Sequence, residues 1–409
     1  MIFKVKCSRI WVCAIAVLVA VTVIITIVNV ASPSTNYNST YNVLTQNTPS
    51  NNKIAEKINK IRGVWVPYMS LETSEHTEKS FKNNFDKIVD TAKKHKMNAL
   101  IVHVRPFSDA LYNSEIFPSS HIVTGEQGKK LDFDPLKYMV EKAHSEGLTF
   151  HAWINPYRIS TSDTPKKLSE NSIINTLGDE NILVYDGGKY INPASTKGRE
   201  LIIKGVKEIV ENYDVDGIQF DDYFYPSAET ALDSVSYNNY KDELDDECTA
   251  LTPYEWRKSN VNMLISSVYQ TIKSTKNNVV FGISPQGNIN NCLEIGADIY
   301  TWCNTYGYVD YICPQIYVNF EHSVLPFDTM LKQWQEATQS GKTILCIGLA
   351  LYKAGSNDDE GTWQNSNEIL KKEVEYCKEQ KINSFMIYDI DYFTKEETEE
   401  EVKNVMSVL

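Results

Sequence analysis

One acidic segment near the middle of the chain carries the residue types best suited to catalysis. The segment DGIQFDDYFYP, residues 216–226, begins as an apolar run and ends with the adjacent acids Asp221 and Asp222. Side chains of a strand alternate between its two faces, so Gln219, Asp221 and Tyr223 are predicted to share one face. Adjacent acids repel each other and are costly to bury, so structure alone seldom selects such a pair. Hydrolysis of a glycosidic bond requires two carboxyl groups, one as proton donor and one as nucleophile or base.

Three acids are predicted to be catalytic. Asp221 is the expected nucleophile or base, because its side chain should point into the open end of the predicted fold, where its strand ends. Asp222 either turns inward beside it or orients its neighbour. Asp389 ends another apolar strand, where burial would raise its pKa as a proton donor requires. The alternatives for the second acid are Asp222 and Glu321, and Asp389 has the further alternative of a structural acid paired with Arg105.

Polar and aromatic side chains near the ends of the predicted strands are expected to bind substrate. Amides and guanidinium groups bind hydroxyls, and flat rings stack on sugar faces. The predicted substrate-binding residues are His103, Arg105, Trp153, Asn155, Arg158, Gln219, Tyr223, Gln315 and Tyr317. Structural alternatives stay open for some of them: a core histidine at His103, partners of buried acids at the two arginines, and a core aromatic at Trp153.

Eight apolar runs that alternate with amphipathic segments must position these residues. The runs cover 63–68, 98–106, 149–156, 215–223, 279–285, 309–317, 343–352 and 383–391. The longer segments between them predict helices at 81–95, 136–146, 198–213, 255–274, 329–339 and 367–379. Alternation of this kind indicates βα units and a parallel sheet. Eight units predict an α/β fold, a (β/α)8 TIM barrel with long βα loops, in which functional residues lie where the strands end. A doubly wound sheet is the alternative, but the first strand-to-helix turn, PYMSLETSE, has no glycine.

The first sixty residues differ in composition from the rest. A basic start precedes an uncharged apolar run, residues 10–30, which is long enough to cross a bilayer as a helix. The predicted parts are a signal anchor or transmembrane segment over 1–31, a flexible Ser/Thr/Asn-rich linker over 32–60 and the barrel domain over 61–409. The expected location is the cell membrane, crossed once, with the domain outside the cell. A cleaved signal peptide is the alternative, and it would make the protein secreted.

Charge and missing motifs exclude several partners and cofactors. The chain has 40 basic and 53 acidic residues, a net charge of −13, so it should repel phosphate backbones and nucleic acid is not an expected partner. The seven histidines form no H-x-x-H pair, and the eight cysteines show no C-x-x-C spacing. We therefore expect no metal and no other cofactor. The lack of a G-x-S-x-G elbow disfavours an esterase of the α/β-hydrolase fold.

Six short segments, taken in order, carry a resemblance to a known family. They are RGVWV (62–66), HVRPFSDALYNSEIFPSS (103–120), LTFHAWINPYR (148–158), INPASTKGRE (191–200), DGIQFDDYFYP (216–226) and DYICPQIY (310–317). Together they resemble the bacterial glycosyl hydrolase-like 10 family. The resemblance implies an exported TIM-barrel glycoside hydrolase, with some relatives acting on peptidoglycan glycan strands. It places the acid of the family's fourth strand on Asp221, with Asp222 beside it. The chain departs from the D-G-x-D-x-D-x-E pattern of family 18 chitinases, because Gln219 and Tyr223 stand where that pattern has Asp and Glu.

The sequence thus predicts a glycoside hydrolase that cleaves a cell-wall or related polysaccharide by carboxylate acid–base chemistry. Its expected partners are the polysaccharide, with peptidoglycan glycan strands as one possibility, and the membrane through the N-terminal helix. One alternative is a catalytically silent carbohydrate-binding or scaffold protein on the same barrel. A different wall-active hydrolase, such as a metal-dependent deacetylase or amidase, is the third hypothesis.

Overall fold

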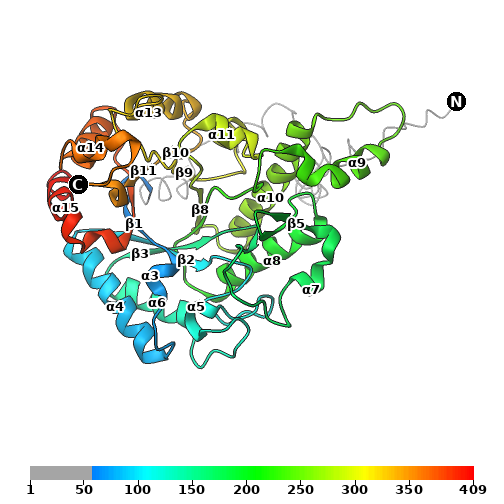
Figure 1. Cartoon of the computed structure of the whole chain (residues 1–409), viewed down its shortest axis with the longest axis horizontal. Coiled ribbons are helices and arrows are strands. Elements are labelled where there is room, and N and C mark those ends of the chain that lie inside the picture. Colours follow the sequence, from blue (N-terminus) through cyan, green and yellow to red (C-terminus); the bar gives the residue numbers. More distant parts are fainter. Residues whose placement is uncertain (1–57) are drawn as a thin grey trace, which may run out of the picture.

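The structure, a computed structural model, describes residues 58–409 and forms a parallel barrel surrounded by helices (Figure 1). The sheet has nine strands in the order β10-β9-β8-β7-β3-β2-β1-β12-β11. The strands are β1 (Arg62–Val66), β2 (Ala99–Arg105), β3 (Thr149–Ile154), β7 (Gly217–Phe220), β8 (Val280–Ile283), β9 (Tyr311–Ile312), β10 (Ile344–Leu345), β11 (Ile347–Ala350) and β12 (Phe385–Tyr388). Each of the eight predicted apolar runs overlaps one of these strands, or two in the case of the seventh run.

The barrel is closed by the seventh predicted apolar run, residues 343–352, which contains both β10 and β11. Strands β10 and β11 lie at opposite ends of the sheet order, yet only Cys346 separates them in sequence. Cys346 N donates to Ile312 O at 2.9 Å, and Ile347 N donates to Ser384 O at 2.9 Å, so this run bonds to neighbours on both sides. The predicted α/β barrel is therefore confirmed.

Helices follow most of the strands and cover the outside of the barrel (Figure 1). They are α3 (Tyr68–Leu71), α4 (Glu78–Lys94), α5 (His121–Thr124), α6 (Pro135–Ser145), α7 (Ile174–Leu177), α8 (Thr196–Asn212), α9 (Ser234–Asp242), α10 (Pro253–Thr275), α11 (Ile289–Glu294), α12 (Ile299–Asn304), α13 (Phe327–Ala337), α14 (Ile369–Glu379) and α15 (Glu399–Met406). The three longest helices, α4, α8 and α10, and also α6 begin where the sequence supplies a cap. Thr77, Asp134, Ser195 and Thr252 each accept a backbone N–H in the first turn of their helix.

Two apolar layers hold the barrel together. On β1, Val64 and Val66 belong to the layer between strands and helices, whereas Trp65 fills the barrel interior. Gly282 on β8 makes room for another interior ring, because a Cβ there would lie 2.1 Å from the Cζ of Tyr311. Complete burial of one large apolar side chain stabilises the fold by about 1.5–3 kcal/mol. Packing on both faces therefore fixes where each strand ends.

The long insert after β3 folds as a small antiparallel sheet, which the sequence analysis did not predict. Its strands, β4 (Arg158–Ser160), β5 (Ile182–Tyr185) and β6 (Gly188–Ile191), lie in the order β4-β6-β5. Asp186 and Gly187 form the tight turn between β5 and β6, with φ values of 48° and 72°. Two consecutive positive φ angles fit a two-residue hairpin of the primed type. The sheet holds Arg158 at the start of β4.

The location predicted from the sequence needs correction. No helix among residues 58–409 is long and apolar enough to cross a membrane. The structure therefore gives no support to a membrane-spanning protein with an external domain. The predicted signal anchor, residues 1–31, and most of the predicted linker, residues 32–60, lie outside the described residues.

Two acids are buried together between the last helices. Glu373 of α14 is fully buried, and neither of its carboxyl oxygens has a hydrogen-bond partner among the described residues. Glu401 of α15 is 2% exposed and accepts the backbone N–H groups of Ile369 at 3.2 Å and Leu370 at 2.6 Å. Burial first, and Glu401 second, raise the pKa of Glu373 well above its ordinary value. Burial therefore favours the neutral form of Glu373.

Replacing Glu373 should make stability less dependent on pH. A carboxyl whose folded pKa exceeds its unfolded pKa contributes stability below pH about 4.5 and loses it as the pH rises toward the folded pKa. We expect Glu373→Gln to gain stability relative to the wild type as the pH rises from 4.5 to 8, because the wild type must take up a proton to fold and the variant need not; each pH unit above the unfolded pKa adds about 1.4 kcal/mol until the folded pKa is reached. Below pH about 4.5 the difference between the two proteins should no longer change with pH. Thermal melts from pH 4.5 to 8 measure it, with the exposed Glu375→Gln as control; a difference independent of pH would contradict the expectation.

Candidate active site

Asp221 lies at the carboxyl end of β7, facing the mouth of the barrel. It is 3% exposed. Its Oδ2 accepts hydrogen bonds from Trp153 Nε1 at 3.0 Å and from Asn155 Nδ2 at 3.3 Å. Both donors come from the end of β3, which pairs with β7 in parallel register. The Oδ1 atom is buried without a hydrogen-bond partner among the described residues, which leaves one acceptor for a bound molecule.

Asp222 is held from the opposite side. Its Oδ1 accepts a hydrogen bond from Gln315 Nε2 at 3.2 Å, and the same nitrogen donates to Ser284 O at 3.0 Å. Gln315 follows β9 and Ser284 follows β8, so the next two strands of the barrel position this carboxyl. Asp222 is partly exposed, whereas Asp221 is buried. The two adjacent acids thus have separate sets of donors.

The pair has an electrostatic environment suited to holding a proton. Burial, with a further contribution from the charge of Asp222, raises the pKa of Asp221 to about 7. Burial also raises the pKa of Asp222, while hydrogen bonds and the charge of Arg158 oppose the rise. Like charges this close do not both ionise readily. Near neutral pH the site can therefore offer a proton donor and a carboxylate side by side.

Arg158 brings a positive charge to the mouth. Its guanidinium carbon lies 4.9 Å from the centre of the Phe107 ring and 5.2 Å from that of Tyr223. Its Nε donates to Pro106 O at 3.0 Å, and its backbone N donates to Asn155 Oδ1 at 3.0 Å. The charge of Arg158 lowers the pKa of both Asp221 and Asp222, against the effect of burial. Arginine so placed is available to bind substrate oxygens.

Tyrosine rings line another part of the mouth. Tyr317 contacts Tyr352 and Tyr388, with ring centres 5.7 and 5.9 Å apart, and Tyr352 contacts Tyr388 at 5.7 Å. Tyr223, by contrast, is 48% exposed. Burial and neighbouring groups, including Asp389 and Tyr223, raise the pKa of Tyr388. Tyr352 and Tyr388 are not among the predicted substrate-binding residues, although both follow or end barrel strands, where site residues concentrate.

His103 packs against Trp153, one of the two residues that donate a hydrogen bond to Asp221. It is 2% exposed and stacks on Trp153, with ring centres 3.8 Å apart and an angle of 7° between the planes. Neither ring nitrogen has a hydrogen-bond partner among the described residues. Burial and the nearby Arg158 hold the pKa of His103 well below its ordinary value, so the ring is neutral. His103 and Trp153 therefore support Asp221 from below.

Arg105, another of the predicted substrate-binding residues, points away from the barrel mouth. It is 1% exposed, and its guanidinium carbon lies 4.4 Å from the centre of the Phe117 ring. On the helix side it approaches α8, where a Cβ on Gly205 would lie 2.2 Å from Arg105 Nη1. The pairing of β2 with β3 shifts register between His103 and Arg105. This irregularity breaks the alternation of faces, so Arg105 turns toward the helices instead of the mouth.

Gln219 and Asp389 make their hydrogen bonds to residues other than the two adjacent acids. Gln219 is fully buried in the barrel, where its Oε1 accepts from Trp65 Nε1 at 2.6 Å and its Nε2 donates to Tyr311 OH at 3.1 Å. Asp389 Oδ1 accepts from Asp391 N at 2.9 Å and caps a short 3-10 helix, residues 390–393. Burial and Asp391 raise the pKa of Asp389 to about 6. The structure thus gives Gln219 core contacts and Asp389 contacts within its own loop.

Glu321, the remaining alternative acid, is exposed and accepts a hydrogen bond from Asn365 Nδ2 at 2.6 Å. Among residues 58–409, no group of three or more His, Cys, Asp and Glu side chains is placed to hold a metal ion.

The barrel with its acidic and aromatic mouth defines a TIM-barrel protein of the glycoside hydrolase type. Residues 60–365 match the family described as Glycosyl hydrolase-like 10, and the chain belongs to this family. It is similar to the glycosyl hydrolase YngK of Bacillus subtilis, with 33% identity over 346 residues that cover 78% of this chain and 66% of that relative. It is also similar to the glycosyl hydrolase DigH of Escherichia coli K12, with 31% identity over 377 residues that cover 84% of each.

Solved structures share the fold. The glycoside hydrolase domain of PgaB (BpsB) from Bordetella bronchiseptica superimposes with a TM-score of 0.56 and 12% identity, covering 86% of this chain and 99% of that one. An α-L-fucosidase isoenzyme 2 from Paenibacillus thiaminolyticus superimposes with a TM-score of 0.52 and 15% identity, covering 85% and 49%. At these identities the likeness concerns the fold alone.

Proposed function

We propose that the protein hydrolyses O-glycosidic bonds of a polysaccharide, with Asp221 and Asp222 as the reacting carboxyl groups. The observation that carries the proposal is the buried Asp221, whose pKa is raised to about 7 beside a second acid at the mouth of the barrel. Membership of the glycosyl hydrolase-like 10 family supports the same reaction. Two carboxyl groups at different protonation states are what glycoside hydrolysis requires.

The difference in burial between the two acids supports an assignment of their roles. Asp221 is more deeply buried than Asp222, so its neutral form is favoured and we assign it the proton. Asp221 then protonates the leaving oxygen, and Asp222 acts as the base or nucleophile. This assignment reverses the role that the sequence analysis gave to Asp221. Gln315 and Arg158 stabilise the carboxylate of Asp222 through a hydrogen bond and a positive charge.

A sugar polymer is the substrate class that the mouth fits. The tyrosine rings offer flat apolar faces, and Asn155, Gln315 and Arg158 offer donors and acceptors for hydroxyl groups. Within this class we propose a cell-wall polysaccharide, and the family resemblance favours peptidoglycan glycan strands as the first substrate to test.

Purified peptidoglycan glycan strands and a panel of other polysaccharides test the proposal. Wild-type protein should release shorter fragments with new reducing ends, measured by chromatography and mass spectrometry. Glycans that bind in a pull-down without ever yielding shorter products would instead favour a silent carbohydrate-binding protein.

The exposed ring of Tyr223 should contribute to substrate binding. It is 48% exposed and packs against Arg158, so Tyr223→Ala removes a stacking surface without opening the core. An aromatic contact contributes about 0.5–1.5 kcal/mol, so we expect KM to rise roughly 2- to 10-fold. We expect kcat to change less than KM. Steady-state kinetics measure both, and Tyr300→Ala, an equally exposed ring on α12, serves as the control; an equal rise of KM in both variants would remove Tyr223 from the binding surface.

A further inference from the structure

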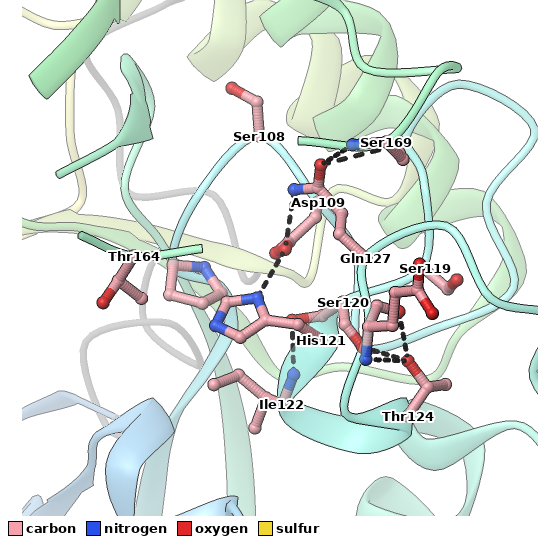
Figure 2. Close-up of polar contacts among 12 residues, drawn as sticks. Ser108, Asp109, Ser119, Ser120, His121, Ile122, Thr124, Gln127, Thr164 and Ser169 are labelled. Atoms are coloured by element: carbon pink, nitrogen blue, oxygen red, sulfur yellow. Dashed lines mark hydrogen bonds and ion pairs between the residues drawn. The ribbon is translucent and has the colours of Figure 1, made fainter. Parts of the chain in front are cut away.

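A second acidic site lies in the insert between β2 and α6, where the fully buried Asp109 meets a partly buried histidine (Figure 2). Asp109 Oδ2 lies 3.2 Å from His121 Nδ1 and accepts a hydrogen bond from Gln127 Nε2 at 3.1 Å. Gln127 Oε1 in turn accepts from Ser169 N at 3.0 Å, in the insert after β4. Through Gln127, the Asp109 carboxyl thus links the insert after β2 to the insert after β4.

The network is costly for a merely structural contact. Asp109 is completely buried, and its Oδ1 has no hydrogen-bond partner among the described residues. A buried carboxyl that is only partly bonded costs free energy, and an apolar residue of similar size would often stabilise the loop better. An acid at this position therefore suggests a role beyond holding the loop together.

Phe107 connects this network to the proposed active site. The His121 ring lies 5.5 Å from the Phe107 ring, centre to centre. The Phe107 ring packs edge-on against Tyr68 at 5.2 Å and lies 4.9 Å from the guanidinium carbon of Arg158. Arg158 acts electrostatically on Asp221 and Asp222. Contacts therefore run without interruption from Asp109 through His121 and Phe107 to Arg158.

We propose that Asp109 and His121 are positioning residues, which hold Phe107 in place so that Arg158 keeps its distance to the two reacting carboxyls. The inference rests on the proposed function for its role in catalysis. The hydrogen bond to Asp109 fixes the orientation of the imidazole, and the imidazole limits the positions of the Phe107 ring. A cation held against a ring with fixed orientation acts on its neighbours at a defined distance, whereas a mobile one is better screened by water.

Loss of the pair should shift the titration of the catalytic acids. Asp109→Asn removes the charge and leaves the shape, while His121→Ala removes the ring that contacts Phe107. In both variants Arg158 becomes less fixed, its stabilisation of the carboxylates weakens, and the apparent pKa values of Asp221 and Asp222 rise by roughly half a unit to one unit. The whole pH–rate profile should move to higher pH by the same amount, with a smaller change in KM than in kcat.

The test combines turnover with a readout that needs no turnover. Carbon-13 NMR of labelled aspartate carboxyls reports the titration of Asp221 and Asp222 in each variant directly. Glu208→Gln is the matched control, because Glu208 braces the same insert through Ser114 Oγ at 2.6 Å and Glu115 N at 2.7 Å. We expect Glu208→Gln to lower thermal stability without moving the titration.

The outcomes separate the two proposals. A shifted titration in Asp109→Asn and His121→Ala, together with an unshifted one in Glu208→Gln, supports the positioning role. An unshifted titration in all three variants overturns it, whatever their thermal stability. A shifted titration in a protein that cleaves no glycan keeps the positioning role and overturns the proposed hydrolase function.

Discussion

Asp221→Asn is expected to lower kcat on a polysaccharide by about 10²- to 10⁴-fold, the range contributed by a positioned proton donor. Asparagine keeps the size of the side chain and one acceptor oxygen, and Trp153 and Asn155 both donate to a single oxygen of Asp221. The folded structure should persist. The exposed Asp214→Asn, a substitution just before the same strand, provides the control and should retain full activity.

Two further measurements identify Asp221 as the proton donor. Aryl glycosides with acidic leaving groups need little protonation, so the loss caused by Asp221→Asn should be much smaller on them than on natural glycans. The wild-type rate should fall above about pH 7, because Asp221, with a pKa of about 7, must be protonated to act. The variant should lack this decline. A loss of equal size on every leaving group would assign the proton to another residue.

The sequence placed Asp221 correctly because its position depends on local rules. Alternation of faces along an apolar run, together with the rule that function lies at strand ends, predicts a side chain aimed into the mouth. Asn155, Trp153 and Gln315 follow from the same rules, and the structure brings all three to the two acids. Their roles in binding or catalysis stay predictions.

The same rules do not predict the direction of a side chain where local geometry departs from regular pairing. Arg105 sits two residues after His103, yet a register shift in β2 turns it toward α8. The segment HVRPF, residues 103–107, does not predict the register shift, because the shift depends on how β2 pairs with β3. Asp389 ends a strand like Asp221, but it caps the short helix that follows and its carboxyl stays with that loop.

Depth within the barrel is another property that the sequence does not reveal. Gln219 shares a face with Asp221, two residues further from the mouth, and there it bonds to Trp65 and Tyr311. These partners lie 154 and 92 residues away in the chain, so no local pattern predicts them. A polar residue that faces the barrel interior is therefore part of the site only if it also lies in the layer of side chains nearest the mouth.

Asp222→Asn should have an even larger effect on catalysis than the loss of the proton donor. If Asp222 is the base or nucleophile, its carboxylate has no substitute, and activity should fall on substrates with good and poor leaving groups alike, by about 10³-fold or more. Steady-state rates on aryl glycosides and on the polysaccharide distinguish this pattern from that of Asp221→Asn. Azide added to the variant should restore turnover of the aryl glycoside if the enzyme retains configuration, with a glycosyl azide as the product.

The same substitution also tests the electrostatic coupling of the two acids. The charge of Asp222 is the strongest charge that raises the pKa of Asp221, so a neutral asparagine should let the pKa of Asp221 fall below 7. Carbon-13 NMR of the Asp221 carboxyl measures that change without turnover. Because Gln315 Nε2 bonds to a side-chain oxygen that asparagine retains, a change in pKa would reflect the lost charge and not a displaced loop. An unchanged titration, or full activity on every substrate, would remove Asp222 from the reaction and leave Asp221 without its partner.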